Sequence, residues 1–200
     1  MKIILASQSG VRKQILDKYN IDNEVIVSNV DEDEIKESLL AEGANPTLIS
    51  KNLAEIKSIK VSSKNPDRFV LGADSVISLD NEIINKPKNR EEAFSILKRL
   101  NNSIHYLISS VCISKNGSMI WNYTDSSELK MKDLTEGELM SYLNRIKTET
   151  LLAYGVYQIE ANGLELFDYV KGERNSIMGL PIKEIMEYID QYKKWKKNLE

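Results

Sequence analysis

The fold is decided by residues 104–134, which run IHYLISSVCISKNGSMIWNYTDSSELKMKDL. Residues 104–114 and 119–134 form two long runs with the β-branched and aromatic content that is typical of strands. Between them lies Lys115-Asn116-Gly117-Ser118, and an Asn-Gly pair between two such runs is a strong hairpin signal. The stretch therefore predicts one long antiparallel hairpin.

Shorter strands are predicted on both sides of this hairpin. Residues 2–5 and 24–28 have the apolar pattern of short strands, and residues 69–78 that of a longer buried strand. Residues 164–170 are a further strand candidate.

Helices are predicted between these strands from capping residues and apolar spacing. The first opens near Ser9 and presents Ile15, Leu16 and Tyr19 on one face. Helices interleaved with strands, together with one long hairpin, predict an α/β protein with a mixed sheet. The other helix starts are Asn45-Pro46, Asn89 with Glu92, the capping box Thr135-x-x-Glu138, and Pro181.

Length and composition predict a single domain over residues 1–200. Hydrophobic residues make up 42% of the chain and charged residues 28%, which is ordinary for a globular protein and excludes a disordered one. No apolar run approaches the ~20 residues that span a bilayer, and Ser7 interrupts the N-terminal run too early for a signal peptide. The single Cys112 excludes internal disulfides and cysteine-rich metal sites, so we expect a cytoplasmic protein.

The charge balance argues against nucleic acid and membranes as partners. The chain has 27 basic and 30 acidic residues, whereas proteins that bind phosphate backbones usually have a basic surplus. The lysine-rich stretch at residues 193–197 fits a helix C-terminus, where cations are favourable. A small anionic ligand remains compatible with this balance, because a few local cations can bind it.

The turn Ser7-Gln8-Ser9-Gly10-Val11-Arg12 is the first candidate binding site. A helix N-terminus offers unpaired N–H groups, and here Ser7, Ser9 and Arg12 could add contacts to phosphate oxygens. The alternative is a plain serine N-cap followed by a solvated arginine.

Asp74 is the second candidate, because it ends a buried run after Gly72-Ala73. A buried carboxylate is costly unless it is paired or holds a metal ion, and magnesium sites often use one beside substrate phosphates. The alternative is an aspartate that caps a turn. Lys57 on a helix and Lys86 in a loop are two further candidate site residues. For each of them the alternative is a solvated surface position.

Taken together and in order, these segments resemble the Maf family of nucleotide pyrophosphatases. The resemblance extends to about residue 190. Its motifs are Leu5-Ala6-Ser7-x-Ser9-x-x-Arg12, Asp31-Glu32, Leu53-Ala54-x-x-Lys57, Gly72-Ala73-Asp74-Ser75-Val76, Lys86-Pro87, Arg99-Leu100, His105, Gly155-x-Tyr157 and Gly179-Leu180-Pro181.

The resemblance implies an elongated mixed sheet flanked by helices, like that of inosine triphosphatases, with a cleft between two lobes. It also implies hydrolysis of nucleoside triphosphates to monophosphate and pyrophosphate, assisted by a divalent metal such as Mg²⁺ or Mn²⁺. Asp74 would then activate the attacking water and, with Glu32, hold the metal. Ser7, Ser9, Arg12, Lys57 and Lys86 would bind the triphosphate.

The chain departs from the commonest family pattern at positions that concern the substrate. Gly10-Val11 replaces Pro-Arg, which removes one cation from the turn, and Gln158 with Glu160 replaces the pattern of dTTP/UTP-type members. We expect Gln158 and Glu160 near the base, with purine or modified triphosphates such as 7-methyl-GTP as candidate substrates. The alternative is that Glu160 binds metal or caps a loop, with Gln158 nearer the base. The rival hypotheses are a nucleotide-binding regulator of cell division without turnover and a scaffold without ligand. We keep a homodimer as a candidate assembly.

Overall fold

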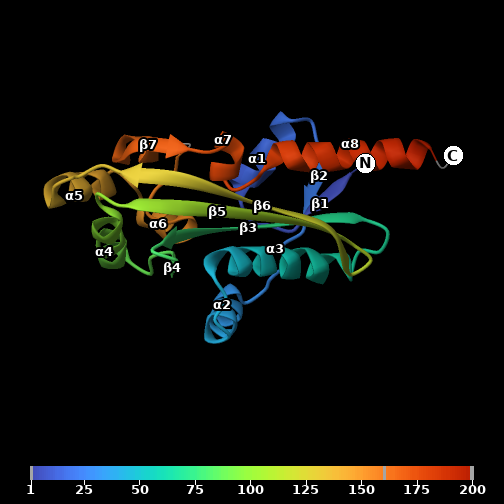
Figure 1. Cartoon of the computed structure of the whole chain (residues 1–200), viewed down its shortest axis with the longest axis horizontal. Helices are drawn as coiled ribbons and strands as arrows, with labels where there is room; N and C mark the ends of the chain where they lie inside the picture. Colours follow the sequence, from blue (N-terminus) through green and yellow to red (C-terminus); the bar gives the residue numbers. More distant parts are fainter. Residues whose placement is uncertain (1, 160, 199–200) are drawn as a thin grey trace.

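The computed structural model describes residues 2–159 and 161–198, and these contain a seven-stranded mixed sheet (Figure 1). Its main path runs in the order β2-β1-β3-β5-β6-β7, and β4 pairs with β3 alone. The predicted α/β class with a mixed sheet is therefore confirmed. The strands are β1 (Ile3–Leu5), β2 (Asn23–Val25), β3 (Phe69–Leu79), β4 (Glu82–Ile84), β5 (Ile104–Lys115), β6 (Ser118–Met131) and β7 (Phe167–Lys171).

The predicted hairpin is confirmed as β5 and β6. Lys115 pairs with Ser118 across a turn in which Asn116 has φ 52° and Gly117 has φ 75°, the backbone that favours an Asn-Gly pair. The second strand ends at Met131, not at residue 134. The Asn101 side chain bonds both the N–H and the carbonyl of Leu134, which places that segment in a loop.

Two of the shorter strand predictions needed correction. The second strand covers only Asn23–Val25, where β2 pairs in parallel with β1. The strand predicted over residues 164–170 starts later, at Phe167, because residues 164–166 belong to the 3-10 helix η1 (Asn162–Leu166). Gly163 donates its N–H to the Gln158 carbonyl at 2.9 Å, so the chain turns back there before β7 starts.

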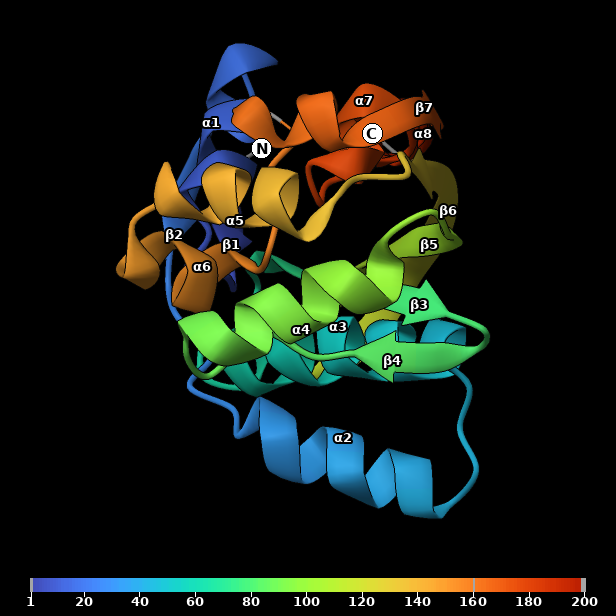
Figure 2. The same ribbon diagram turned by 90° about the vertical axis from the view of Figure 1, so that its left-hand side faces the viewer.

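The helices pack on both faces of the long strands. In Figure 1, α3 lies against one face and α1 and α8 lie on the other, while α2 stands apart from the sheet beyond α3 (Figure 2). The predicted N-caps Ser9, Asn45 and Asn89 and the capping box at Thr135 are confirmed. The helices are α1 (Gly10–Lys18), α2 (Glu32–Ala41), α3 (Pro46–Ser62), α4 (Arg90–Leu100), α5 (Glu136–Asn144), α6 (Thr148–Tyr154), α7 (Arg174–Ile177) and α8 (Ile182–Lys197).

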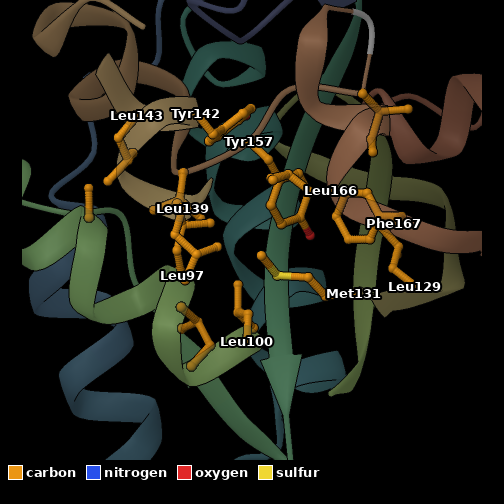
Figure 3. Packing of buried hydrophobic residues seen from close by; sticks show 14 of the residues in the cluster. Leu97, Leu100, Leu129, Met131, Leu139, Tyr142, Leu143, Tyr157, Leu166 and Phe167 are labelled. Carbon is orange, nitrogen blue, oxygen red and sulfur yellow. The ribbon is translucent and has the colours of Figure 1, made fainter. Parts of the chain in front are cut away.

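Buried apolar side chains gather in two large clusters at opposite ends of the long strands. One contains Leu97, Leu139 and Phe167 and joins α4, α5 and the β6–β7 end (Figure 3). The other joins β1, α1 and α8 through residues such as Leu16 and Ile185. A cleft of about 540 Å³ opens between these ends. Within the described residues, no helix is long and apolar enough to cross a membrane.

Candidate active site

The cleft brings together the predicted site residues that the structure describes. Residues from the β1–α1 turn, α2, α3, β3, the β4–α4 loop and the segment after α6 all line it. These are Ser7, Ser9, Arg12, Glu32, Lys57, Asp74, Lys86 and Gln158. Glu160 lies outside the described residues.

The first turn is held in shape by its own side chains. Ser9 caps α1 by accepting from the Arg12 N–H at 3.3 Å, and the Ser7 hydroxyl accepts from the Ser9 N–H at 3.2 Å. The turn therefore presents the N-terminus of α1 to the cleft, as the sequence predicts.

Arg12 crosses from this turn to two distant segments. Its guanidinium donates to the carbonyls of Gly179 and Ala73, both at 2.9 Å, and to the Ser7 and Ser75 hydroxyls. Burial lowers the pKa of Arg12, while Asp74 and Glu32 act in the opposite direction. The side chain thus ties the turn to β3 and to the loop before α8, with all but one of its N–H donors occupied.

Gly179 permits this arrangement of Arg12. Its backbone has φ 93°, and a Cβ there would lie 3.1 Å from the Ser75 hydroxyl and 3.3 Å from Arg12 Nε. A glycine is therefore required both by the left-handed backbone and by the close approach of the guanidinium.

Lys57 joins the two carboxylates, Asp74 and Glu32, that line the described part of the cleft. Its Nζ lies 2.7 Å from Asp74 Oδ1 and 2.8 Å from Glu32 Oε1. Burial alone would raise the pKa of Glu32, but the charge and hydrogen bond of Lys57 outweigh burial, so that pKa is lowered. The pairing favours the ionised form of Glu32, and two of the three Lys57 donors are used by described residues, which leaves one for another acceptor.

The close packing of α3 on β3 produces this pairing. A Cβ on Gly72 would lie 2.1 Å from the Ala54 carbonyl oxygen and 2.8 Å from the Ser58 nitrogen, so only glycine lets the helix approach this near. Lys57 stands on α3 and Asp74 follows Gly72 by two residues on β3. The glycine before the aspartate therefore has a direct role in building the site.

The other oxygen of Asp74 is the open position of the site. Asp74 is 5% exposed, and Oδ2 is buried with no hydrogen-bond partner among the described residues. A buried carboxylate oxygen without a partner is costly, so its retention in a polar cleft indicates a role toward a ligand, a water or an ion.

Lys86 supplies a cation from the opposite wall. Lys86 lies just after β4, and its Nζ donates to the carbonyl of Ala153 near the end of α6 at 2.8 Å. Burial lowers the pKa of Lys86, and the neighbouring cations Arg12 and Lys36 lower it further, whereas Glu32 and Asp74 raise it. Three cations that line one cleft, Arg12, Lys36 and Lys86, favour an anionic ligand there.

A divalent cation fits two of these side chains. Among residues 2–159 and 161–198, no group of three or more His, Cys, Asp and Glu side chains could hold a metal ion. Asp74 and Glu32 do share a partner in Lys57, and Asp74 Oδ2 has no hydrogen-bond partner within the part of the chain that the structure describes. Magnesium commonly binds through one or two carboxylates plus substrate phosphates, so this donor set fits such an ion.

Comparison with known proteins identifies the family. The family described as Maf-like protein matches residues 2–192 of the chain. The chain belongs to the Maf-like protein family. A nucleoside triphosphate pyrophosphatase of Pelagibacter ubique is 58% identical to it, covering 94% of this chain and 96% of the relative. A 7-methyl-GTP pyrophosphatase of Brucella abortus is 33% identical, covering 93% and 94%.

Among solved structures, a HAM1 protein from Coxiella burnetii matches this Maf-like chain with a TM-score of 0.45 and 13% identity, covering 67% of this chain and 74% of that one.

Two residues of this Maf-like site were not predicted as binding residues from the sequence. Lys36 lines the cleft from α2, a helix that was itself missed although Asp31-x-x-Glu34 is an N-terminal signature of the capping type. Tyr157 also lines it, and its hydroxyl lies 2.9 Å from Nε2 of the fully buried His105. Burial lowers the pKa of His105 to about 4, so the imidazole is neutral near pH 7.

Proposed function

We propose that the protein hydrolyses nucleoside triphosphates to the monophosphate and pyrophosphate in this cleft. Relatives that match over nearly the whole chain have the names nucleoside triphosphate pyrophosphatase and 7-methyl-GTP pyrophosphatase. The observation that carries the proposal is Asp74, buried at the cleft with one oxygen on Lys57 and the other without a described partner.

The reaction joins a water oxygen to the α-phosphorus and breaks the bond between that phosphorus and the oxygen leading to the β-phosphate. Asp74 accepts the proton that the attacking water loses. Its Oδ2, which has no partner among the described residues, supports this role. The Lys57 ammonium fixes Oδ1 and so orients the carboxylate. Pyrophosphate then leaves with the electron pair of the broken bond.

An aspartate is a weak base near neutral pH, because its ordinary pKa is ~3.9. A bound divalent cation, Mg²⁺ or Mn²⁺, would lower the pKa of water and neutralise phosphate charge. Asp74 and Glu32 are the residues that would hold it, and Lys57 lies between them.

The triphosphate is placed by the cations and the first turn. Ser7 and Ser9 shape the N-terminus of α1, Lys86 faces it from the other wall, and Arg12 and Lys57 each keep a donor for phosphate oxygens. Negative charge develops on the phosphoryl oxygens in this transition state and must be stabilised. Positioning and cations therefore supply most of the catalysis.

The base is proposed to lie near Gln158 and Glu160. Gln158 lines the cleft directly after Tyr157. An ionised Glu160 only accepts hydrogen bonds, which suits the adjacent N–H donors of guanine and places like charge against a pyrimidine carbonyl. Guanine-type triphosphates, including 7-methyl-GTP, are therefore the proposed substrates ahead of dTTP and UTP.

We further expect a cytoplasmic protein, with a homodimer as its candidate assembly. Neither nucleic acid nor a membrane is expected as a partner. The rival of a nucleotide-binding regulator without turnover differs from the enzyme in one measurable respect, the release of products.

The test is product analysis with GTP, 7-methyl-GTP, dTTP and UTP in the presence of Mg²⁺ or Mn²⁺. We expect equal amounts of monophosphate and pyrophosphate, no products after chelation of the metal, and the highest kcat/KM with a guanine-type substrate. Release of inorganic phosphate and a nucleoside diphosphate would contradict attack at the α-phosphorus. Tight binding without any product would favour the regulator.

A further inference from the structure

The cations of the cleft differ in how many of their donors the protein already uses. Arg12 has four acceptors, Lys57 has two carboxylates and Lys86 has one carbonyl. Lys36 has no hydrogen-bond partner among the described residues, and its one ion pair, with Asp33, is long at 3.8 Å. Lys36 is thus the cleft cation with the most donors open to a ligand.

The position of Lys36 favours a ligand over a solvated surface role. Its side chain is 17% exposed, whereas that of Asp33 is 85% exposed, so the lysine points toward the protein and its partner toward water. Lys36 follows Glu32 by one helical turn on α2, and Glu32 reaches Lys57 inside the cleft. The same helix face therefore carries both side chains to the site.

The charge balance of the cleft gives Lys36 a task. Among the described residues, the charged side chains that line it are Arg12, Lys36, Lys57 and Lys86 against Glu32 and Asp74, an excess of two positive charges. Val11, in the first turn, lines the same cleft and carries no charge. Without Lys36 the excess would fall to one, although a triphosphate brings several negative charges.

We propose that Lys36 is a further substrate-binding residue that contacts the phosphate chain of the triphosphate, a proposal that rests on the proposed function. The Lys36 ammonium donates to phosphate oxygens beyond the α-phosphate and supplies from α2 a cation in addition to Arg12 of the first turn. A monophosphate does not extend to it. The residue thereby contributes to the preference for triphosphates over the monophosphate product.

The test measures binding of an α,β-methylene triphosphate analogue and of the matching monophosphate by calorimetry. Lys36→Ala is expected to weaken analogue binding about tenfold, the order of one charge-assisted hydrogen bond, and monophosphate binding less than twofold. Lys36→Arg should retain most of the affinity. Lys64→Ala, which removes an exposed cation just after α3 and outside the cleft, is the matched control and should bind as the wild type does.

A second variant separates a phosphate contact from a structural effect. Val11→Arg added to Lys36→Ala returns a cation to the cleft from another element, and recovery of analogue affinity would support the proposal. Wild-type affinity in Lys36→Ala, or equal losses for the analogue and the monophosphate, would overturn it. Because the analogue is not cleaved, these outcomes are independent of turnover. Absence of product from every nucleotide with the wild-type protein would instead overturn the proposed function.

Discussion

Asp74 is the residue on which the proposed chemistry depends most. Its carboxylate is buried, anchored through Oδ1 and unpartnered at Oδ2 among the described residues. Asp74→Asn keeps the shape and one oxygen but cannot accept the proton. We expect kcat to fall about 10²- to 10⁴-fold while the triphosphate analogue still binds.

Asp80→Asn is the matched control for that substitution. Asp80 is an exposed residue of the β3–β4 turn with φ 51°, a backbone that asparagine also adopts readily. Its kcat should equal that of the wild type. A folded Asp74→Asn protein that keeps more than a tenth of wild-type kcat would exclude Asp74 as the proton acceptor.

His105 should make folding sensitive to acid. Burial holds its pKa at about 4 in the folded protein, below the ~6.5 of an unfolded chain. Between these two values the unfolded chain takes up a proton that the folded chain refuses, so stability is complete above the unfolded pKa and falls as pH drops toward the folded one.

His105→Phe tests this residue, because it keeps an aromatic ring beside Tyr157 and Phe167 and removes the titrating group. Between pH 7 and pH 4, denaturant unfolding should show the wild type losing more stability than the variant, by up to about 3 kcal/mol. Parallel curves would mean that the folded and unfolded states bind protons at this position equally.

At the scale of elements, the close contact between α3 and β3 brings Lys57 to Asp74. Gly72→Ala would place a methyl group 2.1 Å from the Ala54 carbonyl oxygen, so α3 must move away from the sheet. We expect the free energy of unfolding to fall by at least about 1–3 kcal/mol, and kcat to fall because Lys57 moves off Asp74. Chemical denaturation and steady-state kinetics measure the two effects.

Gly137→Ala is the matched control for Gly72→Ala. Gly137 lies in α5 and is exposed, and a Cβ there would have its nearest neighbour at 4.0 Å. Its stability should stay the same or rise by up to about 1 kcal/mol, since alanine is the better helix former. Equal stabilities for the two alanine variants would refute the close approach at Gly72.

The elements that the sequence predicted well are those with strong local signals. The Asn116-Gly117 turn and the Thr135–Glu138 capping box depend on neighbours in the chain alone, and both are confirmed. Helix α2 was missed because it has no buried residue and so lacks an apolar stripe. Its place near the site depends on the contact from Glu32 to Lys57, which joins residues distant in sequence.

The same distinction applies to the site. The resemblance to the Maf family implied that Arg12, Lys57, Asp74 and Lys86 share one site, and the cleft contains all four. The sequence could not show that Lys57 would pair with two carboxylates or that Arg12 would bond to Gly179. Both contacts depend on the approach of backbones that only the folded chain brings together.

For the whole molecule, the cleft lies between the two apolar clusters, and its walls come from elements that belong to each. Arg12 extends from α1 at one end, whereas Lys86 and Gln158 come from segments near the other. A ligand that contacts both sides should therefore stabilise the chain as one unit. This gives a prediction for thermal unfolding in the presence of an uncleaved triphosphate analogue and a divalent metal.

At an analogue concentration of about 100 times Kd, linkage adds about 2.7 kcal/mol to the free energy of unfolding. For a chain of 200 residues this corresponds to a rise in Tm of roughly 5–10 °C, measured by calorimetry as a single transition. The monophosphate at the same concentration should raise Tm much less, and Lys86→Ala should lose most of the difference between the two ligands. Two separate transitions, of which the analogue moves one alone, would show that the cleft does not couple the two ends of the sheet.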